Sequence, residues 1–203
     1  KKNGNFILIE MDEDYYQKYK QTGWTEKREM YGMTLEQDSN QYETELPMDT
    51  PRRSDLILAN TALKYAQSNN ISFAYDGQVI GMGCGQQNRV DCVKLAGAKA
   101  TNWLKRHTSV SLDFWNTLEG KRQEKINKLY EFVNNSSTDE SSEELVMASD
   151  GFFPFPDNIR EAHRFNVKSI IQPGGSVADD TVQKECDKYG ISMITTGTRM
   201  FYH

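Results

Sequence analysis

The stretch Gln78 to Arg106, QVIGMGCGQQNRVDCVKLAGAKATNWLKR, passes from a strand pattern to a helix pattern through a run rich in glycine. The largely apolar residues from Ile71 to Ile80 predict the strand. Three alternating glycines follow it: Gly81, Gly83 and Gly85. Because residues without a Cβ let a backbone turn tightly and lie against a ligand, these glycines predict a loop rather than further strand.

A helix is expected after the glycines. Asn88 is a candidate N-cap, the apolar residues after it recur near the helical period, and basic Lys105 and Arg106 suit a helix C-terminus. A glycine-rich turn that leads into a helix leaves N–H groups unpaired, which predicts a phosphate or carboxylate ligand. From the glycines alone a plain structural turn is an equal alternative, since their spacing matches neither the dinucleotide fingerprint nor the P-loop.

Composition and charge limit the classes of partner. The 203 residues suffice for the core of one domain, and the formal net charge of -5 argues against nucleic acid, because binding a polyanion calls for a basic excess. No stretch has the length and apolarity of a membrane span, and the first residues lack the pattern of a secretory signal. The three cysteines show neither a disulfide framework nor zinc-ligand spacing. These features predict a reduced, cytoplasmic protein.

The segments before the central stretch also alternate. Phe6 to Met11 predicts a strand, and residues 12–53 predict an irregular surface excursion with a short helix near Thr25 to Met30. A helix capped by Ser54 is expected to end near Gln67. Together with the central strand and helix, these segments predict an α/β sandwich.

The second half continues the alternation. Its expected elements are a helix over Leu118 to Val133, a mobile acidic loop over 134–144, a helix over Ile159 to Phe165, a strand over Val167 to Ile171, a helix over Val177 to Tyr189 and a strand over Ile191 to Thr195. Pro173 to Ser176 is a second glycine-containing turn into a helix, and Gly190 is expected to end that helix. Since open α/β sheets bind ligands at strand ends, the two turns and the tail are the expected binding region.

Four motifs, in order, resemble one enzyme family. They are KYAQSNNISFAYDGQVIGMGCGQQNRVDCVKLAGAKA (64–100), SDGFFPFPDN (149–158), PGGSVADD (173–180) and TRMFYH (198–203). The pattern resembles the aminoimidazolecarboxamide ribonucleotide (AICAR) formyltransferase domain of the bifunctional purine-biosynthesis enzyme, whose other domain is IMP cyclohydrolase. The resemblance covers the whole chain and is weakest between Asp12 and Arg53.

This resemblance implies a fold and an assembly. Each lobe of that transformylase is similar to a cytidine deaminase, a three-layer α/β/α sandwich, and its active sites are completed across a homodimer. Residues 1–203 resemble the C-terminal lobe, which implies that the chain is a fragment of a longer protein. The zinc motifs of the deaminases, H-x-E and C-x-x-C, do not occur in the sequence, so zinc is not expected.

The implied reaction transfers a formyl group from 10-formyltetrahydrofolate to the amine of AICAR and gives formyl-AICAR in the synthesis of IMP. That amine is a poor nucleophile, so the catalyst must align the reactants, remove a proton and stabilise an oxyanion. The family's Lys-His pair, in the earlier lobe, has no counterpart among the three histidines here, so this lobe alone is expected to be inactive. The alternative is a noncatalytic nucleotide- or anion-binding module; an unrelated oxidoreductase is disfavoured by the glycine spacing.

Four positions match residues that contact the nucleotide in the family. Arg199 matches the phosphate-binding arginine, whose fork can pair with two oxygens; otherwise it is a solvated arginine near the chain end. Asn69 matches an asparagine beside the reacting amine, a catalytic assignment, and is otherwise a turn residue. Arg89 is otherwise a first-turn helix arginine, and Phe152 otherwise belongs to the core.

Three further positions match folate contacts. Asp157 matches the acid that binds the pterin-like ring, and Ser176 and Val177 match a short stretch beside the folate. For Asp157 and Ser176 the alternative role is capping of the helices that follow.

The family also binds a monovalent cation, expected to be potassium, near the substrate. Ser68 and Asp150 match two positions of that site, but Ala66 and Asn70 stand where the family has hydroxyl groups. Asp150 is otherwise a buried acid satisfied by backbone amides.

Overall fold

The computed structural model describes residues 9–21, 25–135 and 143–202. The chain divides into two compact units, Lys1–Glu43 and Thr44–His203. The predicted strand Phe6 to Met11 lies partly outside the described residues, and its last three residues are not in a strand.

The first unit contains a helix and a hairpin: α1 (Glu13–Gln21), β1 (Thr25–Met30) and β2 (Met33–Asp38). The prediction of a helix near Thr25 to Met30 is therefore wrong. Tyr31 and Gly32 both have positive φ, 52° and 75°, as the tight turn of a two-residue hairpin requires. This turn and the cross-strand ion pair between Lys27 and Glu36, 2.5 Å, favour paired strands.

The second unit is built on a five-stranded sheet in the order β4-β3-β5-β6-β7. Its strands are β3 (Ile71–Tyr75), β4 (Gln78–Gly83), β5 (Leu145–Ser149), β6 (Val167–Gln172) and β7 (Ser192–Thr195). The strands β5, β6 and β7 are parallel, whereas β3 is antiparallel to both of its neighbours. The fully buried strand β5, near the middle of the sheet, was not predicted, because its continuous apolar run carries no alternation.

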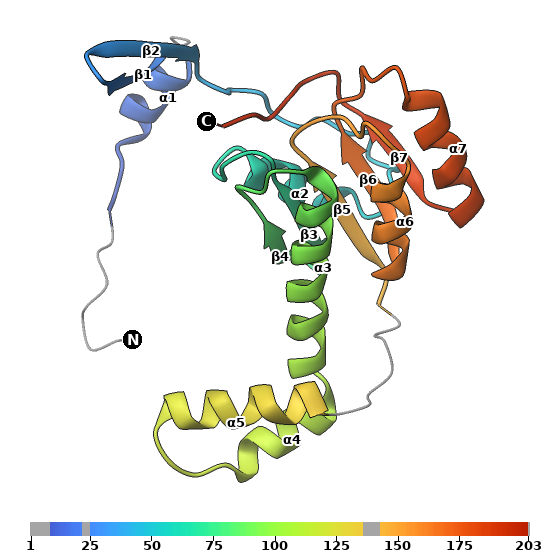
Figure 1. Ribbon diagram of the computed structural model, residues 1–203. Coiled ribbons are helices and arrows are strands. Elements are labelled where there is room, and N and C mark those ends of the chain that lie inside the picture. The colour runs from blue at the N-terminus through green and yellow to red at the C-terminus, as the bar shows by residue number, and fades with distance from the viewer. Residues whose placement is uncertain (1–8, 22–24, 136–142, 203) are drawn as a thin grey trace. The chain divides into compact units, whose positions relative to one another are not determined.

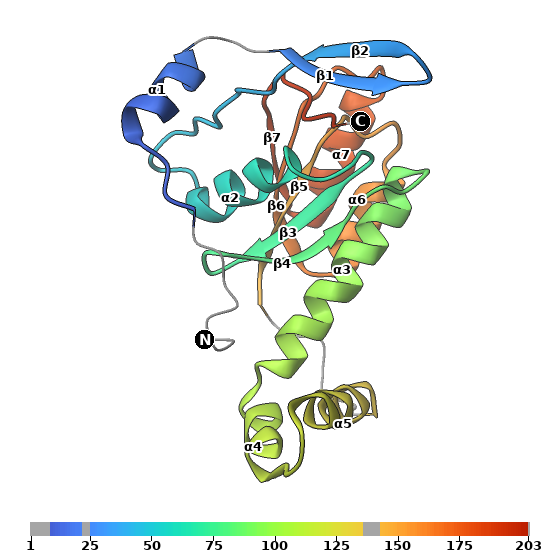
Figure 2. The same ribbon diagram turned by 90° about the vertical axis from the view of Figure 1, so that its left-hand side faces the viewer.

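Helices cover both faces of this sheet (Figures 1 and 2). They are α2 (Arg53–Leu63) on one face, and α3 (Arg89–Arg106), α6 (Asp157–Arg164) and α7 (Asp179–Tyr189) on the other. Alternation along β3 explains the two layers of core: Ile71 and Phe73 join the cluster with α3, while the Ser72 hydroxyl donates to the Ala59 carbonyl of α2, 2.7 Å. The predicted three-layer α/β/α sandwich is confirmed.

The glycines after the central strand have a different role from the one predicted. Gly81 and Gly83 lie within β4, and a Cβ on either would overlap backbone atoms of α3, the carbonyl oxygens of Ala96 and Cys92 respectively. The glycines thus let the helix backbone lie directly on the strand. The loop begins only after Gly83, and Gly85, with φ of 65°, belongs to it.

The strand predicted from Ile71 to Ile80 is in fact a hairpin of β3 and β4. Asp76 and Gly77 form its turn with φ of 47° and 73°, and both of their N–H groups donate to the Asp55 carboxylate. An Asp-Gly pair between apolar runs is a strong hairpin signal, so this turn was readable from the sequence.

Helix boundaries agree with the sequence where caps are strong. The Asn88 side chain accepts from the Asp91 N–H at 2.9 Å and starts α3 as predicted, and Gly190, with φ of 63°, ends α7. The predicted Ser54 cap is wrong, because α2 starts at Arg53 and no side chain caps it. The helix predicted from Leu118 is α5 (Arg122–Asn135), preceded by an unpredicted helix, α4 (Ser109–Thr117). Residues 136–142 of the predicted acidic loop lie outside the described residues.

We expect Gly81→Ala to lower the free energy of unfolding by about 3 kcal/mol, because the new methyl group forces α3 away from β4. Gly77→Ala is the matched control: its Cβ meets no atom within 4 Å, so only the positive φ is unfavourable, at about 1 kcal/mol. Urea denaturation measures both. Equal losses would show that helix contact is not the reason for glycine in β4.

Candidate functional site

The topology of the sheet gathers several segments at one edge. The parallel strands β5, β6 and β7 all end there, and the antiparallel strand β3 begins there, with Ile71 paired to both Ser149 and Gly83. The loop after β4 leads directly into α3 at the same edge. Residues 67–70, 84–89 and 149–155 therefore meet, as the expectation of a site at strand ends requires.

A cavity of about 390 Å³ lies at this edge. Its lining residues are Asn69, Gln87, Asn88, Arg89, Phe152, Pro154 and Phe201. Three of the four residues predicted to contact a nucleotide thus line a single cavity of a size suited to a small ligand.

The fourth residue, Arg199, lies beside this cavity. Its side chain is exposed, and its guanidinium carbon is 5.6 Å from the ring centroid of Phe152 and 5.7 Å from that of Phe201. Guanidinium groups at this distance from aromatic rings are held by cation–π attraction. Arg199 is therefore placed to bring positive charge to a ligand in the cavity.

Arg89 is not the ordinary helix arginine of the alternative reading. Its side chain is 8% exposed and forms an ion pair with Asp150, which is fully buried. Arg89 Nη1, the nitrogen of this ion pair, also donates to the Ser149 hydroxyl at 3.0 Å, and Nη2 donates to Asn69 Oδ1 at 2.9 Å. The guanidinium thus joins α3 to the end of β5 and to the start of β3.

Asn69 is held at both ends of its amide. While Oδ1 accepts from Arg89, Nδ2 donates to the carbonyl of Gln86 at 3.1 Å. Its backbone carbonyl accepts from the thiol of Cys92 at 3.1 Å. Asn69 is thus a fixed residue on the cavity wall.

Comparisons with known proteins identify the family of this chain. A family model described as "AICARFT/IMPCHase bienzyme" matches residues 1–99. The chain is 34% identical to the "Bifunctional purine biosynthesis protein PurH" of Prochlorococcus marinus (strain MIT 9211) over 79% of its length, and 38% identical to the protein of that name from Lactococcus lactis subsp. lactis (strain IL1403) over 70%. The chain belongs to the AICARFT/IMPCHase bienzyme family.

The matches cover only part of these relatives. The PurH protein of Xylella fastidiosa (strain 9a5c) is 33% identical over 84% of the chain, which spans 26% of the relative. The corresponding shares of the Prochlorococcus and Lactococcus proteins are 24% and 21%. The chain therefore spans about a quarter of the length of the curated relatives it matches.

The predicted folate residues do not line the cavity around Asn69. Asp157 is exposed in the first turn of α6, where its Oδ1 accepts from the Asn158 N–H at 2.8 Å. The Ser176 hydroxyl accepts from the Ala178 N–H at 3.1 Å, and Val177 is fully exposed. These residues follow β5 and β6 at the same sheet edge, and their folate role stays a prediction.

The potassium prediction does not fit the contacts of Ser68 and Asp150. One oxygen of the Asp150 carboxylate pairs with the Arg89 guanidinium, and the other accepts from the Asn70 N–H at 3.1 Å. The Ser68 hydroxyl accepts from the Tyr202 N–H at 3.2 Å. A fixed guanidinium beside the carboxylate disfavours a second cation there, so these two residues do not fit a potassium site. Across the described ranges, no group of three or more His, Cys, Asp or Glu side chains is placed to hold a metal.

Four cavity residues were not predicted individually: Gln87, Asn88, Pro154 and Phe201. Each is within two residues of a predicted site residue, inside the motifs GQQNR, GFFPFP and TRMFYH. Their position in these motifs could have identified the four residues. The sequence does not show which side chains of a motif point into the cavity.

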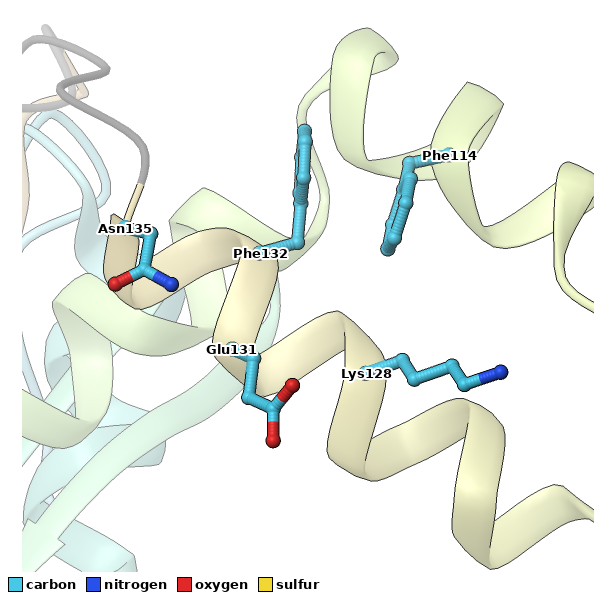
Figure 3. Close-up of a pocket in the computed structure, with 5 residues that line it drawn as sticks. All are labelled: Phe114, Lys128, Glu131, Phe132 and Asn135. Atoms are coloured by element: carbon cyan, nitrogen blue, oxygen red, sulfur yellow. The ribbon is translucent and has the colours of Figure 1, made fainter.

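A second cavity, of about 370 Å³, lies between α4 and α5 (Figure 3). The rings of Phe114 and Phe132 stack there at 4.2 Å between centroids, beside Lys128 and Glu131. None of the predicted site residues lines it.

Among the described residues, no helix has the length and apolarity to cross a membrane.

The thiol of Cys92, which contacts Asn69, is unsuited to act as a nucleophile. Burial raises the pKa of Cys92 to about 11, and burial also raises the pKa of Cys186 to about 12. At pH 8 only about one Cys92 thiol in a thousand is then ionised. Cys84, by contrast, is exposed.

We expect a thiol reagent at pH 8 to modify Cys84 in the native protein and to reach Cys92 and Cys186 only after denaturation, as peptide mass spectrometry can show. Because folding favours the neutral thiols, their contribution to stability is complete below about pH 8.5 and is lost as the pH rises toward 11. Rapid native labelling of Cys92 at pH 8 would contradict the burial.

Proposed function

We propose that this chain is the C-terminal lobe of an AICAR formyltransferase, part of a longer homodimeric cytoplasmic protein of purine biosynthesis. The reaction is formyl transfer from 10-formyltetrahydrofolate to the amine of AICAR. The observation that carries the proposal is the convergence of Asn69, Arg89 and Phe152 on one cavity with Arg199 at its side. The names of the relatives, bifunctional purine biosynthesis proteins, support the same pathway.

The chemistry assigns different tasks to these residues. Arg199 presents a planar fork of donors suited to the phosphate of the nucleotide, and its contacts with Phe152 and Phe201 restrict its motion before the ligand arrives. Asn69 offers an amide to the reacting amine and holds it in line with the formyl carbon. The phenyl ring of Phe152 supplies an apolar wall for the imidazole ring.

The proton transfer requires groups from elsewhere in the longer protein. His107 stacks on Trp103 with 3.9 Å between ring centroids, and His163 stacks on Tyr189 at 4.2 Å. Neither of these two histidines, which are the ones within the described residues, lines the cavity around Asn69. This lobe therefore binds and aligns the substrates, and alone it does not turn them over.

The full-length protein should release tetrahydrofolate when given 10-formyltetrahydrofolate and AICAR, and residues 1–203 alone should not. The measurement is steady-state turnover of both proteins under the same conditions. Turnover by the isolated lobe would refute the division of tasks. Nucleotide binding without turnover by the full-length protein would instead favour the noncatalytic module.

Arg199→Ala should weaken AICAR binding by roughly 30-fold, the loss typical of a charge-assisted hydrogen bond, and should leave the KM for the folate unchanged. The AICAR nucleoside, which lacks the phosphate, should bind both forms equally. Arg160→Ala, at an exposed arginine that pairs with Glu185, is the control. Equal weakening of nucleotide binding and nucleoside binding would show that Arg199 does not bind the phosphate.

Asp157→Asn should raise the KM for the folate by about tenfold with the KM for AICAR unchanged, because a carboxylate accepts two hydrogen bonds from the pterin edge and an amide oxygen accepts fewer. Asp187→Asn, in the exposed part of α7, is the control. An unchanged folate KM would show that Asp157 serves only the first turn of α6, where it accepts from the Asn158 N–H.

A further inference from the structure

We propose that Asp150 is a positioning residue for Asn69 and that it acts through the guanidinium of Arg89. The inference rests on the proposed function, because it explains what fixes the orientation of the Asn69 amide toward the reacting amine. It changes the role of Arg89 from a substrate-binding charge to a rigid connection between a buried carboxylate and the amide on the cavity wall.

Asp150 has the fixed environment that such a role requires. It is fully buried, its carboxylate accepts from the Asn70 N–H, and its own N–H donates to the Asn70 carbonyl at 3.3 Å. The Met200 N–H donates to the Asp150 carbonyl at 2.9 Å. Contacts to Asn70, just before β3, and to the C-terminal tail thus hold this residue on both sides.

The guanidinium transmits that position to Asn69. Nη1 pairs with Asp150, and Nη2 donates to Asn69 Oδ1. Because the guanidinium is planar and only donates, the amide must turn its oxygen toward Arg89 and its Nδ2 toward the Gln86 carbonyl. Asn69 then presents one defined orientation to a substrate amine.

The surroundings leave little freedom for this connection. A Cβ on Gly151 would lie 2.5 Å from Arg89 Nη2 and 2.8 Å from Cε1 of Phe201, so the space beside the guanidinium is filled. The positive charge of Arg89 is compensated by Asp150, whereas Arg199 is exposed. The phosphate is therefore left to Arg199, and Arg89 sets the geometry at the amine.

The first test compares two nucleotides in the full-length protein by calorimetry: AICAR and the same ribonucleotide without the 5-amino group. Asp150→Asn, like Asn69→Ala, should reduce the preference for AICAR by about tenfold and leave the affinity for the analogue unchanged. Glu185→Gln, which removes a partly buried carboxylate that pairs with Arg160 and does not line the cavity, should leave both affinities unchanged. Equal weakening of the two nucleotides by Asp150→Asn would overturn the positioning role, because a general disturbance of the fold affects both.

The second test measures the kcat of the full-length protein with Asp150→Asn and Asn69→Ala, separately and together. Asp150→Asn should lower kcat about 100-fold in the wild-type background, the scale expected for a misplaced catalytic group, and by no more than about twofold in the Asn69→Ala background. A large further loss in that background would also overturn the proposal.

Two outcomes separate the proposals from each other and from misfolding. If the wild-type full-length protein transfers no formyl group but the calorimetric preference behaves as described, the proposed reaction fails and the positioning role holds. If Asp150→Asn does not fold, Ser149→Ala removes one acceptor of Arg89 Nη1 and should give a smaller loss of the same preference. An unchanged preference in a folded Ser149→Ala protein would contradict the connection.

Discussion

The direct contact between α3 and β4 is the constraint on which the rest of the structure depends. It requires the absence of side chains at Gly81 and Gly83, where any Cβ would overlap the helix backbone. Once the helix lies on the strand, its first residue, Arg89, is fixed at the edge of the sheet where β5 ends. A packing requirement at β4, the outermost strand of the sheet, thereby decides where a charged side chain can lie.

That side chain is buried, and burying it is favourable only with compensation. An unpaired guanidinium in the interior is strongly destabilising, whereas one that pairs with a carboxylate and makes further hydrogen bonds is tolerated. Asp150 supplies the opposite charge, and Ser149 and Asn69 accept further hydrogen bonds. The electrostatic requirement of one buried arginine therefore joins three segments that are distant in sequence, and the cavity lies beside them.

The mixed topology of the sheet completes the site. In a purely parallel sheet, the amino end of β3 would lie at the edge opposite the carboxyl end of β5. Because β3 is antiparallel, Asn69 and Asn70 precede it at the same edge where Asp150 follows β5. The C-terminal tail then adds Arg199 and Phe201 to this edge through the contact of Met200 with Asp150.

The sequence by itself determined the helix α3 with its Asn88 cap, the end of α7 at Gly190, the α/β class and the motifs that carry Asn69, Arg89, Phe152 and Arg199. The helix, its cap, the helix end and the class follow from local backbone preferences and periodicity, whereas the motifs were found by their resemblance to a family. Only the tertiary structure decided that Gly81 and Gly83 serve packing rather than a ligand, that Arg89 forms a buried ion pair with Asp150, and that Thr25 to Met30 is a strand. Each of these depends on a partner distant in sequence or across a strand pair, and a side chain's neighbours in space are not encoded in its neighbours along the chain.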